Sequence, residues 1–140
     1  MVGSHSDYGY NEAVYDGSQT LAKDMGNVKV VTADIRQAVA EAMQKYDLVL
    51  LDVDNGPGHL VHDANAAVYQ TPFLQGVHDL LRPGGAVVVW SSAEAPELEK
   101  AMGSVFGEAT AVPFGVELQG QAEEYWLYLA RCDAAPMGTV

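Results

Sequence analysis

The sequence predicts an α/β layered domain with a mainly parallel sheet. Short apolar runs alternate along the chain with segments of helical periodicity, which is typical of this class. Some of these runs are continuous rather than alternating, as expected of strands buried on both faces. The length of 140 residues fits one domain, which we place at residues 11–132. Residues 1–10 look like a flexible leader or a cloning remnant, and residues 133–140 form a tail.

The first half predicts helix, strand, helix and strand in turn. Residues 11–25 favour a helix, although Gly17 interrupts its pattern. Residues 28–32 are a short run rich in β-branched residues and predict a strand. A second helix runs to about Lys45, with apolar residues at helical spacing: Ile35, Ala38, Val39, Ala42 and Met43. With the apolar strand at 48–53, it forms a strand-helix-strand unit whose crossover should be right-handed.

The second half begins with a helix capped by Thr71, with Pro72 in its first turn. The residues Arg82-Pro83-Gly84-Gly85 should end that helix. The remaining predicted elements are a strand at 86–90, a helix from 96 to about 102, a strand at 110–116 interrupted by Pro113, and an aromatic-rich strand at 125–130.

Composition excludes several classes of protein. The formal net charge of −12 would repel phosphates, so we expect no nucleic-acid partner. An acidic field suits a cationic ligand such as a polyamine, and surplus surface acid also keeps proteins soluble. No apolar run approaches the roughly 20 residues that cross a bilayer, and no signal peptide is visible, so we expect a soluble cytoplasmic protein without a membrane partner. The single cysteine, Cys132, excludes an internal disulfide.

The most informative segment is residues 46–57, Tyr-Asp-Leu-Val-Leu-Leu-Asp-Val-Asp-Asn-Gly-Pro, where a buried strand runs into acids, an amide and a turn. In open parallel sheets the ligand crevice lies beyond the carboxyl ends of the strands. Asp52 is expected at that edge. An aspartate there can also cap the loop that follows.

Together, residues 46–57 and the segment 80–90, Leu-Leu-Arg-Pro-Gly-Gly-Ala-Val-Val-Val-Trp, resemble the fourth and fifth strands of the class I S-adenosylmethionine-dependent methyltransferase fold. The closest branch is the spermidine synthase-like proteins. There a strand ends in an aspartate, a proline-containing loop and a tyrosine follow, and a helix closes with a proline-glycine-glycine turn. The resemblance covers about residues 28–132. It implies a Rossmann-like domain and a transferase of polyamine biosynthesis.

The resemblance also implies roles for residues on the donor side. The donor would be S-adenosylmethionine or its decarboxylated form. Asp34 would accept a hydrogen bond from the adenine amino group, with Ile35 beside it on the cofactor side. Asp34 is also placed to cap the second helix, a role that needs no ligand. Asp52 would border the donor and act as the catalytic base that takes a proton from the attacking amine, since a protonated amine is no nucleophile.

On the acceptor side, the resemblance implies that Asp54, Asn55 and Tyr69 line the substrate. The family usually places a second acid in this loop to grip the amine. If Asn55 takes that position, the amide supplies no net attraction for an ammonium group, and Asp54 would have to compensate.

The chain departs from the family in its first half. A glycine-rich cofactor turn after a first strand is absent before Val28, because Gly3, Gly9 and Gly17 are scattered through polar sequence. The fold is therefore expected to be truncated at the N-terminus, with two strands missing. We expect a homo-oligomer or a partner chain to complete the sheet, since an open gap would leave backbone groups unpaired.

Three other interpretations stay open. The chain can be a non-catalytic protein that kept the scaffold for association or for binding a nucleoside ligand. The run around Asp52 and Asp54 also resembles the first motif of haloacid dehalogenase-like phosphatases, but the later lysine and acidic pair that hold magnesium have no clear match. A metal site at His59 and His62 is a weaker alternative, and we assign no metal ligand.

Overall fold

The computed structural model describes residues 10–133, with side chains from Asp16 onward. The chain divides into two compact units, residues 1–38 and 39–140, and each is described by itself. The expected leader, apart from Tyr10, and residues 134–140 of the expected tail lie outside the described residues. None of the helices described is long and apolar enough to span a membrane.

The first unit contains the helix α1 (Tyr10–Met25), which confirms the helix expected at 11–25. Gly17 lies inside α1 without ending it. The strand expected at residues 28–32 is wrong, because this segment has no strand structure and none of the described strands pairs with it. A β-branched run becomes a strand only when a neighbour satisfies its backbone groups, and Val31 here is 64% exposed.

The helix α2 (Ile35–Glu41) crosses from the first unit into the second and is shorter than expected. It ends four residues before Lys45, and none of its residues is buried. Met43, expected on its apolar stripe, is 96% exposed. Helical spacing predicted the helix here, but not its extent or its burial.

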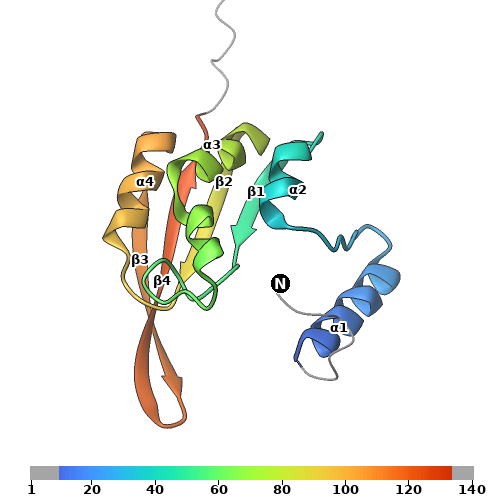
Figure 1. The fold of residues 1–140 in the computed structure, drawn as a ribbon, viewed down its shortest axis with the longest axis horizontal. Helices are drawn as coiled ribbons and strands as arrows, with labels where there is room; N and C mark the ends of the chain where they lie inside the picture. The colour runs from blue at the N-terminus through green and yellow to red at the C-terminus, as the bar shows by residue number, and fades with distance from the viewer. Residues whose placement is uncertain (1–9, 134–140) are drawn as a thin grey trace, which may run out of the picture. The chain divides into compact units, whose positions relative to one another are not determined.

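The second unit is built on four strands in the order β1-β2-β4-β3. Their bounds are β1 (Tyr46–Leu51), β2 (Leu81–Ser91), β3 (Thr110–Leu118) and β4 (Gln121–Arg131). β1 and β2 run parallel, with Leu50 beside Val88, whereas β4 runs antiparallel to both β2 and β3. The α/β class is confirmed. Only one of the three strand pairs is parallel, however, which corrects the expectation of a mainly parallel sheet (Figure 1).

The reversal has a local cause. β3 and β4 are joined by a tight hairpin at Gln119 and Gly120, and both of these residues have positive φ. A hairpin makes its two strands antiparallel, and β4 then enters the sheet between β2 and β3. Pro113, which lacks an N–H, is tolerated because β3 is an edge strand.

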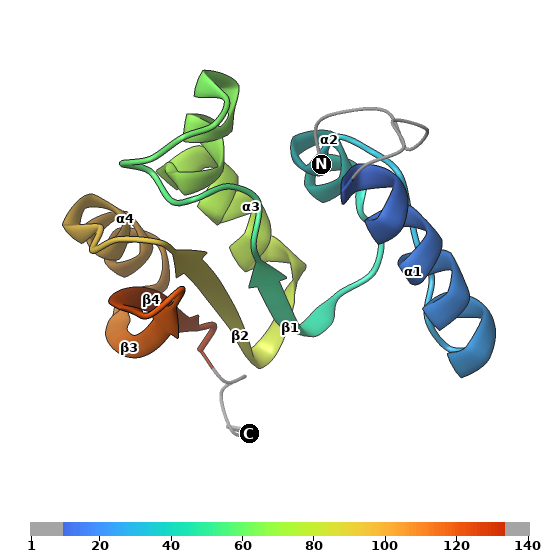
Figure 2. The same cartoon turned by 90° about the horizontal axis from the view of Figure 1, so that it is seen from below.

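The helices of the second unit are the 3₁₀ helix η1 (Asp63–Tyr69), α3 (Thr71–Leu80) and α4 (Pro96–Phe106). Thr71 is the first residue of α3 rather than its cap; Gln70 takes the cap position, with no side-chain hydrogen bond. α3 and α4 lie on one face of the sheet (Figure 2). The core lies between these two helices and the sheet. It includes Leu74, Val77, Val87, Val89, Leu98, Met102 and Tyr128.

The proline-glycine-glycine segment, which lies within the first residues of β2, brings the starts of β1 and β2 together. A Cβ on Gly85 would lie 2.9 Å from the Arg82 carbonyl oxygen and 3.1 Å from the carbonyl oxygens of Tyr46 and Asp47. Only glycine lets these backbones approach so closely. Gly85 therefore sets the position of β1 beside β2. It also fixes where the carboxyl end of β1 lies.

Gly85→Ala should lower the free energy of unfolding by about 1–3 kcal/mol, because the added methyl forces the start of β1 away from β2. The control is Gly103→Ala in α4, where a Cβ would meet nothing within 4 Å. That change should raise stability by about 0.5–1 kcal/mol. Urea unfolding followed by circular dichroism measures both. Equal effects of the two changes would show that the close approach at Gly85 has no energetic weight.

Candidate functional site

The loop that follows β1 is organised by Asp54. Its carboxylate accepts hydrogen bonds from four groups: the backbone N–H of Asn55 at 2.6 Å, of Val61 at 2.9 Å and of His62 at 3.4 Å, and the side-chain amide of Asn65 at 2.8 Å. Asp54 is only 9% exposed. Its oxygens are thus occupied by the protein itself, and the acid closes residues 54–65 into one loop.

The pKa of Asp54 follows from the same contacts. Burial alone would raise the pKa, but the hydrogen bonds from Asn65, Val61, Asn55 and His62 outweigh it and lower the pKa from 3.8 to about 2. The carboxylate therefore stays ionised throughout the physiological range. Asn65, which sequence reasoning missed, lies eleven residues from Asp54 and carries no local spacing signal.

A second set of contacts ties the loop to the end of β2. The carbonyl oxygen of Asn55 accepts hydrogen bonds from the backbone N–H of Ser92 at 2.9 Å and from its hydroxyl at 2.5 Å. Gly56 has a φ of 103°, and a Cβ there would lie 2.1 Å from the Ser91 hydroxyl oxygen. Because glycine alone fits this site, the loop packs directly on the carboxyl end of β2.

Asp52 differs from Asp54 in every respect that matters for chemistry. It follows the last residue of β1 and is exposed. Among the described residues, no hydrogen-bond donor engages its carboxylate. Asp54 therefore has a structural role in this loop. The carboxylate of Asp52, at the edge predicted from the sequence, is available to a ligand.

Tyr69 lies at the end of η1 and is 5% exposed. Its hydroxyl group has no hydrogen-bond partner among the described residues. Burial raises the pKa of this hydroxyl, and the charges of Asp54 and Asp52 raise it further.

A cavity of about 520 Å³ lies at this same edge of the sheet. Pro57 from the loop and Tyr69 contribute to its wall, and the first turns of α3 and α4 complete it with Thr71, Pro72, Glu97 and Leu98. Sequence reasoning assigned no ligand role to Glu97, because a helix alone does not show which loop it faces. The second unit thus places Asp52, Asn55 and Tyr69 around one edge, with the cavity beside Tyr69.

The two remaining predicted site residues, Asp34 and Ile35, belong to the first unit. Asp34 caps α2: it accepts a hydrogen bond from the backbone N–H of Arg36 at 2.8 Å and forms an ion pair with the Arg36 guanidinium at 3.0 Å. The side-chain hydrogen bond from Arg36 lowers the pKa of Asp34 to about 2. Ile35 is half-buried. The capping role is thus present, and the adenine role stays a prediction.

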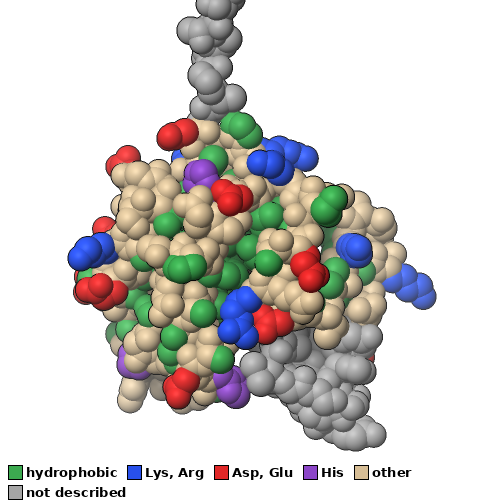
Figure 3. Space-filling view, turned by 45° about the horizontal axis from the view of Figure 1, so that its top comes forward, with side chains coloured by type: hydrophobic (Ala, Val, Ile, Leu, Met, Phe, Trp, Pro, Cys, Tyr) green, Lys and Arg blue, Asp and Glu red, His purple; other side chains and the backbone are tan. Residues whose placement is uncertain are grey.

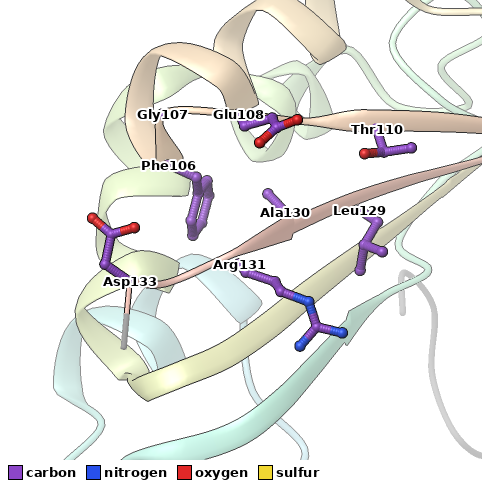
Figure 4. Close-up of a pocket in the computed structure, with 8 residues that line it drawn as sticks. All are labelled: Phe106, Gly107, Glu108, Thr110, Leu129, Ala130, Arg131 and Asp133. Carbon is purple, nitrogen blue, oxygen red and sulfur yellow. The ribbon is translucent and has the colours of Figure 1, made fainter. Parts of the chain in front are cut away.

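A second cavity, of about 400 Å³, lies at the opposite edge (Figure 4). Phe106 extends from the end of α4 and Arg131 from the end of β4. Arg131 pairs with Ala86, near the start of β2, so this cavity is far along the sheet from the loop after β1. Of the two cavities, the one at the carboxyl edge is lined by a predicted site residue, Tyr69.

His59 and His62, which suggested a metal site, are both exposed. Within the part of the chain that the structure describes, no group of three or more His, Cys, Asp or Glu side chains is placed to hold a metal ion. Charged side chains on the face seen in Figure 3 are scattered among apolar ones rather than gathered in one cluster.

Asp54→Asn should lower the free energy of unfolding by about 1–3 kcal/mol at neutral pH, because the amide cannot satisfy all four donors. Since folding lowers the pKa of Asp54, the stability that its charge contributes is present above about pH 4 and is lost as the pH falls toward 2. The difference in free energy of unfolding between wild type and Asp54→Asn should therefore decrease as the pH falls from about 4 toward 2. Asp52→Asn is the control and should stay within about 0.5 kcal/mol of wild type. Equal loss in both variants would exclude the organising role.

No family model matches the chain, and no curated protein matches it. Solved structures do match. A Thermoplasma acidophilum protein assigned as a methyltransferase aligns with a TM-score of 0.61 at 12% identity, over 90% of this chain and 55% of that one.

Two further structures agree. TrmN from Thermus thermophilus aligns with a TM-score of 0.56 at 21% identity, over 86% of this chain and 34% of that one. Human methyltransferase-like protein 13, solved in complex with SAH, aligns with a TM-score of 0.52 at 20% identity, over 87% of this chain and 58% of that one. The chain thus spans between a third and three fifths of the length of these structures. It has the Rossmann-like α/β fold of the methyltransferases.

Proposed function

We propose that this chain is a spermidine synthase-like transferase that moves an aminopropyl or methyl group from an adenosyl sulfonium donor to an amine-type acceptor. The donor is S-adenosylmethionine or its decarboxylated form. The observation that carries the proposal is the exposed carboxylate of Asp52 at the carboxyl end of β1, beside a loop that is fixed by Asp54. The methyltransferase fold of the matching structures supports the choice of donor class.

The chemistry requires a base and a positioned acceptor. The nitrogen lone pair of the amine attacks the carbon attached to the sulfonium, the carbon–sulfur bond breaks, and its electron pair leaves with the neutral thioether. The proton released from nitrogen passes to Asp52. A carboxylate suits this task, because it attracts the ammonium form of the acceptor and accepts its proton.

The other predicted residues take graded roles. Tyr69 and Asn55 line the acceptor side, and the adenine role expected of Asp34 and Ile35 stays a prediction. Asp54 acts differently from the first expectation, since its oxygens already accept hydrogen bonds from its own loop. We assign it to positioning the loop rather than to contact with the substrate.

Calorimetry with S-adenosylmethionine, its decarboxylated form and methylthioadenosine tests the donor. Binding of at least one is expected at millimolar ligand, and no heat with any of the three would exclude the transferase. With a donor and an amine, Asp52→Asn should lower turnover at least about 100-fold, because general base catalysis is typically worth that much. Asp63→Asn, an exposed acid at the start of η1, is the control and should retain turnover. Equal turnover in wild type and Asp52→Asn would show that another group is the base.

A non-catalytic association protein is the second candidate, and a specific observation favours it. β1 is an edge strand of the described sheet, and Leu48 and Leu50 on it are 52% and 68% exposed. Exposed apolar residues on an unpaired edge invite another strand. A second copy of the chain, or a partner chain, would complete the sheet there.

If the edge pairs with a second copy, light scattering should give at least the dimer mass, and Leu50→Lys should shift it to the monomer. A lysine on an edge strand opposes pairing by its charge. Leu21→Lys in α1, where the leucine is 51% exposed, is the control and should leave the mass unchanged. A monomeric wild type at high concentration would exclude self-association through β1.

A further inference from the structure

The sheet has two faces, and α3 and α4 lie on one of them (Figure 2). The buried residues Val87, Val89 and Tyr128 belong to that helix-covered face. Because successive side chains of a strand point to opposite faces, the residues that alternate with these belong to the other face. We refer to this surface as the open face. Its apolar side chains are Leu48 and Leu50 of β1, Val88 and Trp90 of β2, Val112 and Phe114 of β3, and Leu127 and Leu129 of β4.

The open face is apolar across all four strands. Leu48, Leu50 and Phe114 on it are 52%, 68% and 47% exposed. None of the apolar side chains named above carries a charge, although the chain has 19 Asp and Glu residues. A parallel strand pair such as β1 and β2 is normally covered on both faces, and an apolar patch that spans several strands marks an interaction surface. The open face is therefore suited to another layer of protein.

On β4, the open face has one charged residue on each side of its apolar centre. Glu123 lies four residues before Leu127 and Arg131 lies four residues after it, so all three point to the same face. Figure 4 shows Arg131 on the same side of β4 as Leu129. Both charged side chains are exposed, and neither forms an ion pair with a described residue. Opposite charges at equal spacing from a central leucine match a second copy of the same strand that runs the other way.

We propose that the open face binds the open face of a second copy of this chain, with the two β4 strands antiparallel about a two-fold axis at Leu127. Sheets that pack face to face lie about 10 Å apart with their side chains interdigitated. Leu127 meets its counterpart, and its neighbours Trp90 on β2 and Val112 on β3 extend the apolar contact. Glu123 of each copy lies opposite Arg131 of the other, so the two-fold axis gives two ion pairs.

Charge selects both the surface and the orientation of this contact. Two chains with a formal net charge of −12 repel each other, so they associate best through a surface that has an uncharged centre and paired charges around it. If the two β4 strands ran parallel, Glu123 would face Glu123 and Arg131 would face Arg131. Only the antiparallel arrangement places opposite charges together.

This contact differs from strand addition at the edge of β1. β4 pairs with β2 on one side and with β3 on the other, so it offers no free edge to a further strand. A charge reversal on β4 therefore tests face-to-face packing without changing the edge of β1. The inference goes beyond the proposed transferase function and does not depend on it.

The test is sedimentation of the full chain at concentrations up to the millimolar range, where wild type should form a dimer. Arg131→Glu and Glu123→Arg should each raise the dissociation constant of the dimer about tenfold, because each variant places like charges opposite one another at both ends of the contact. The double variant, which carries both changes, should return to within about threefold of wild type, since the exchanged charges are again opposite in sign.

The controls make the same changes of charge away from the open face. Glu124→Arg alters the exposed residue next to Glu123, which points to the other face of β4. Lys100→Glu alters an exposed residue of α4 and matches the charge change of Arg131→Glu. Both controls should stay within about twofold of the wild-type dissociation constant, because exposed charges remote from the contact are screened by salt.

Three results would each overturn the inference: a monomeric wild type, a dimer that neither single charge reversal weakens, or a double variant that stays as weak as the single ones. A dimer that the β4 variants leave unchanged assembles through another surface, such as the edge of β1. All of these substitutions are at exposed positions, and circular dichroism checks that each variant is folded. Calorimetry with the adenosyl ligands is a separate measurement, so this inference and the proposed function can fail independently.

Discussion

The candidate site depends on one buried carboxylate. The carboxylate of Asp54 accepts hydrogen bonds from four groups of its own loop, and these bonds keep it ionised despite its burial. Charge-assisted hydrogen bonds are stronger than neutral ones, so a single acid can order a long segment. With the loop held, the neighbouring Asp52 lies at the end of β1, exposed and without a hydrogen-bond partner among the described residues. The two acids are two residues apart, but Asp54 is hydrogen-bonded within the loop and Asp52 is exposed.

Close backbone packing does the rest. Gly85 brings β1 against the start of β2, and Gly56 brings the loop against the end of β2. Between these two points the parallel register of β1 and β2 is set, and the end of β1 is directed to the edge where α3 and α4 begin. The cavity is thus a product of strand ends and helix starts, an arrangement that α/β proteins commonly use for ligands.

Two further features of the molecule are its negative net charge and its edge strand β1. An acidic molecule attracts cations to all of its surface, but only Glu97 brings that charge into the carboxyl-edge cavity. β1 is an edge strand of the described sheet, and its residues Leu48 and Leu50 are exposed. The chain thus spans part of the length of its structural matches and presents an edge strand with two exposed leucines.

The sequence alone determined the class of fold, most of the elements and the place of Asp52, because period, turn residues and a strand that ends in acids are local signals. It failed at residues 28–32 and overstated the parallel content of the sheet, because a strand exists only if a neighbour pairs with it and direction is set by the hairpin that follows. It also could not distinguish Asp52 from Asp54 or find Asn65 and Glu97. Those roles depend on which groups meet across eleven residues or between two helices, and only the tertiary structure decides such contacts.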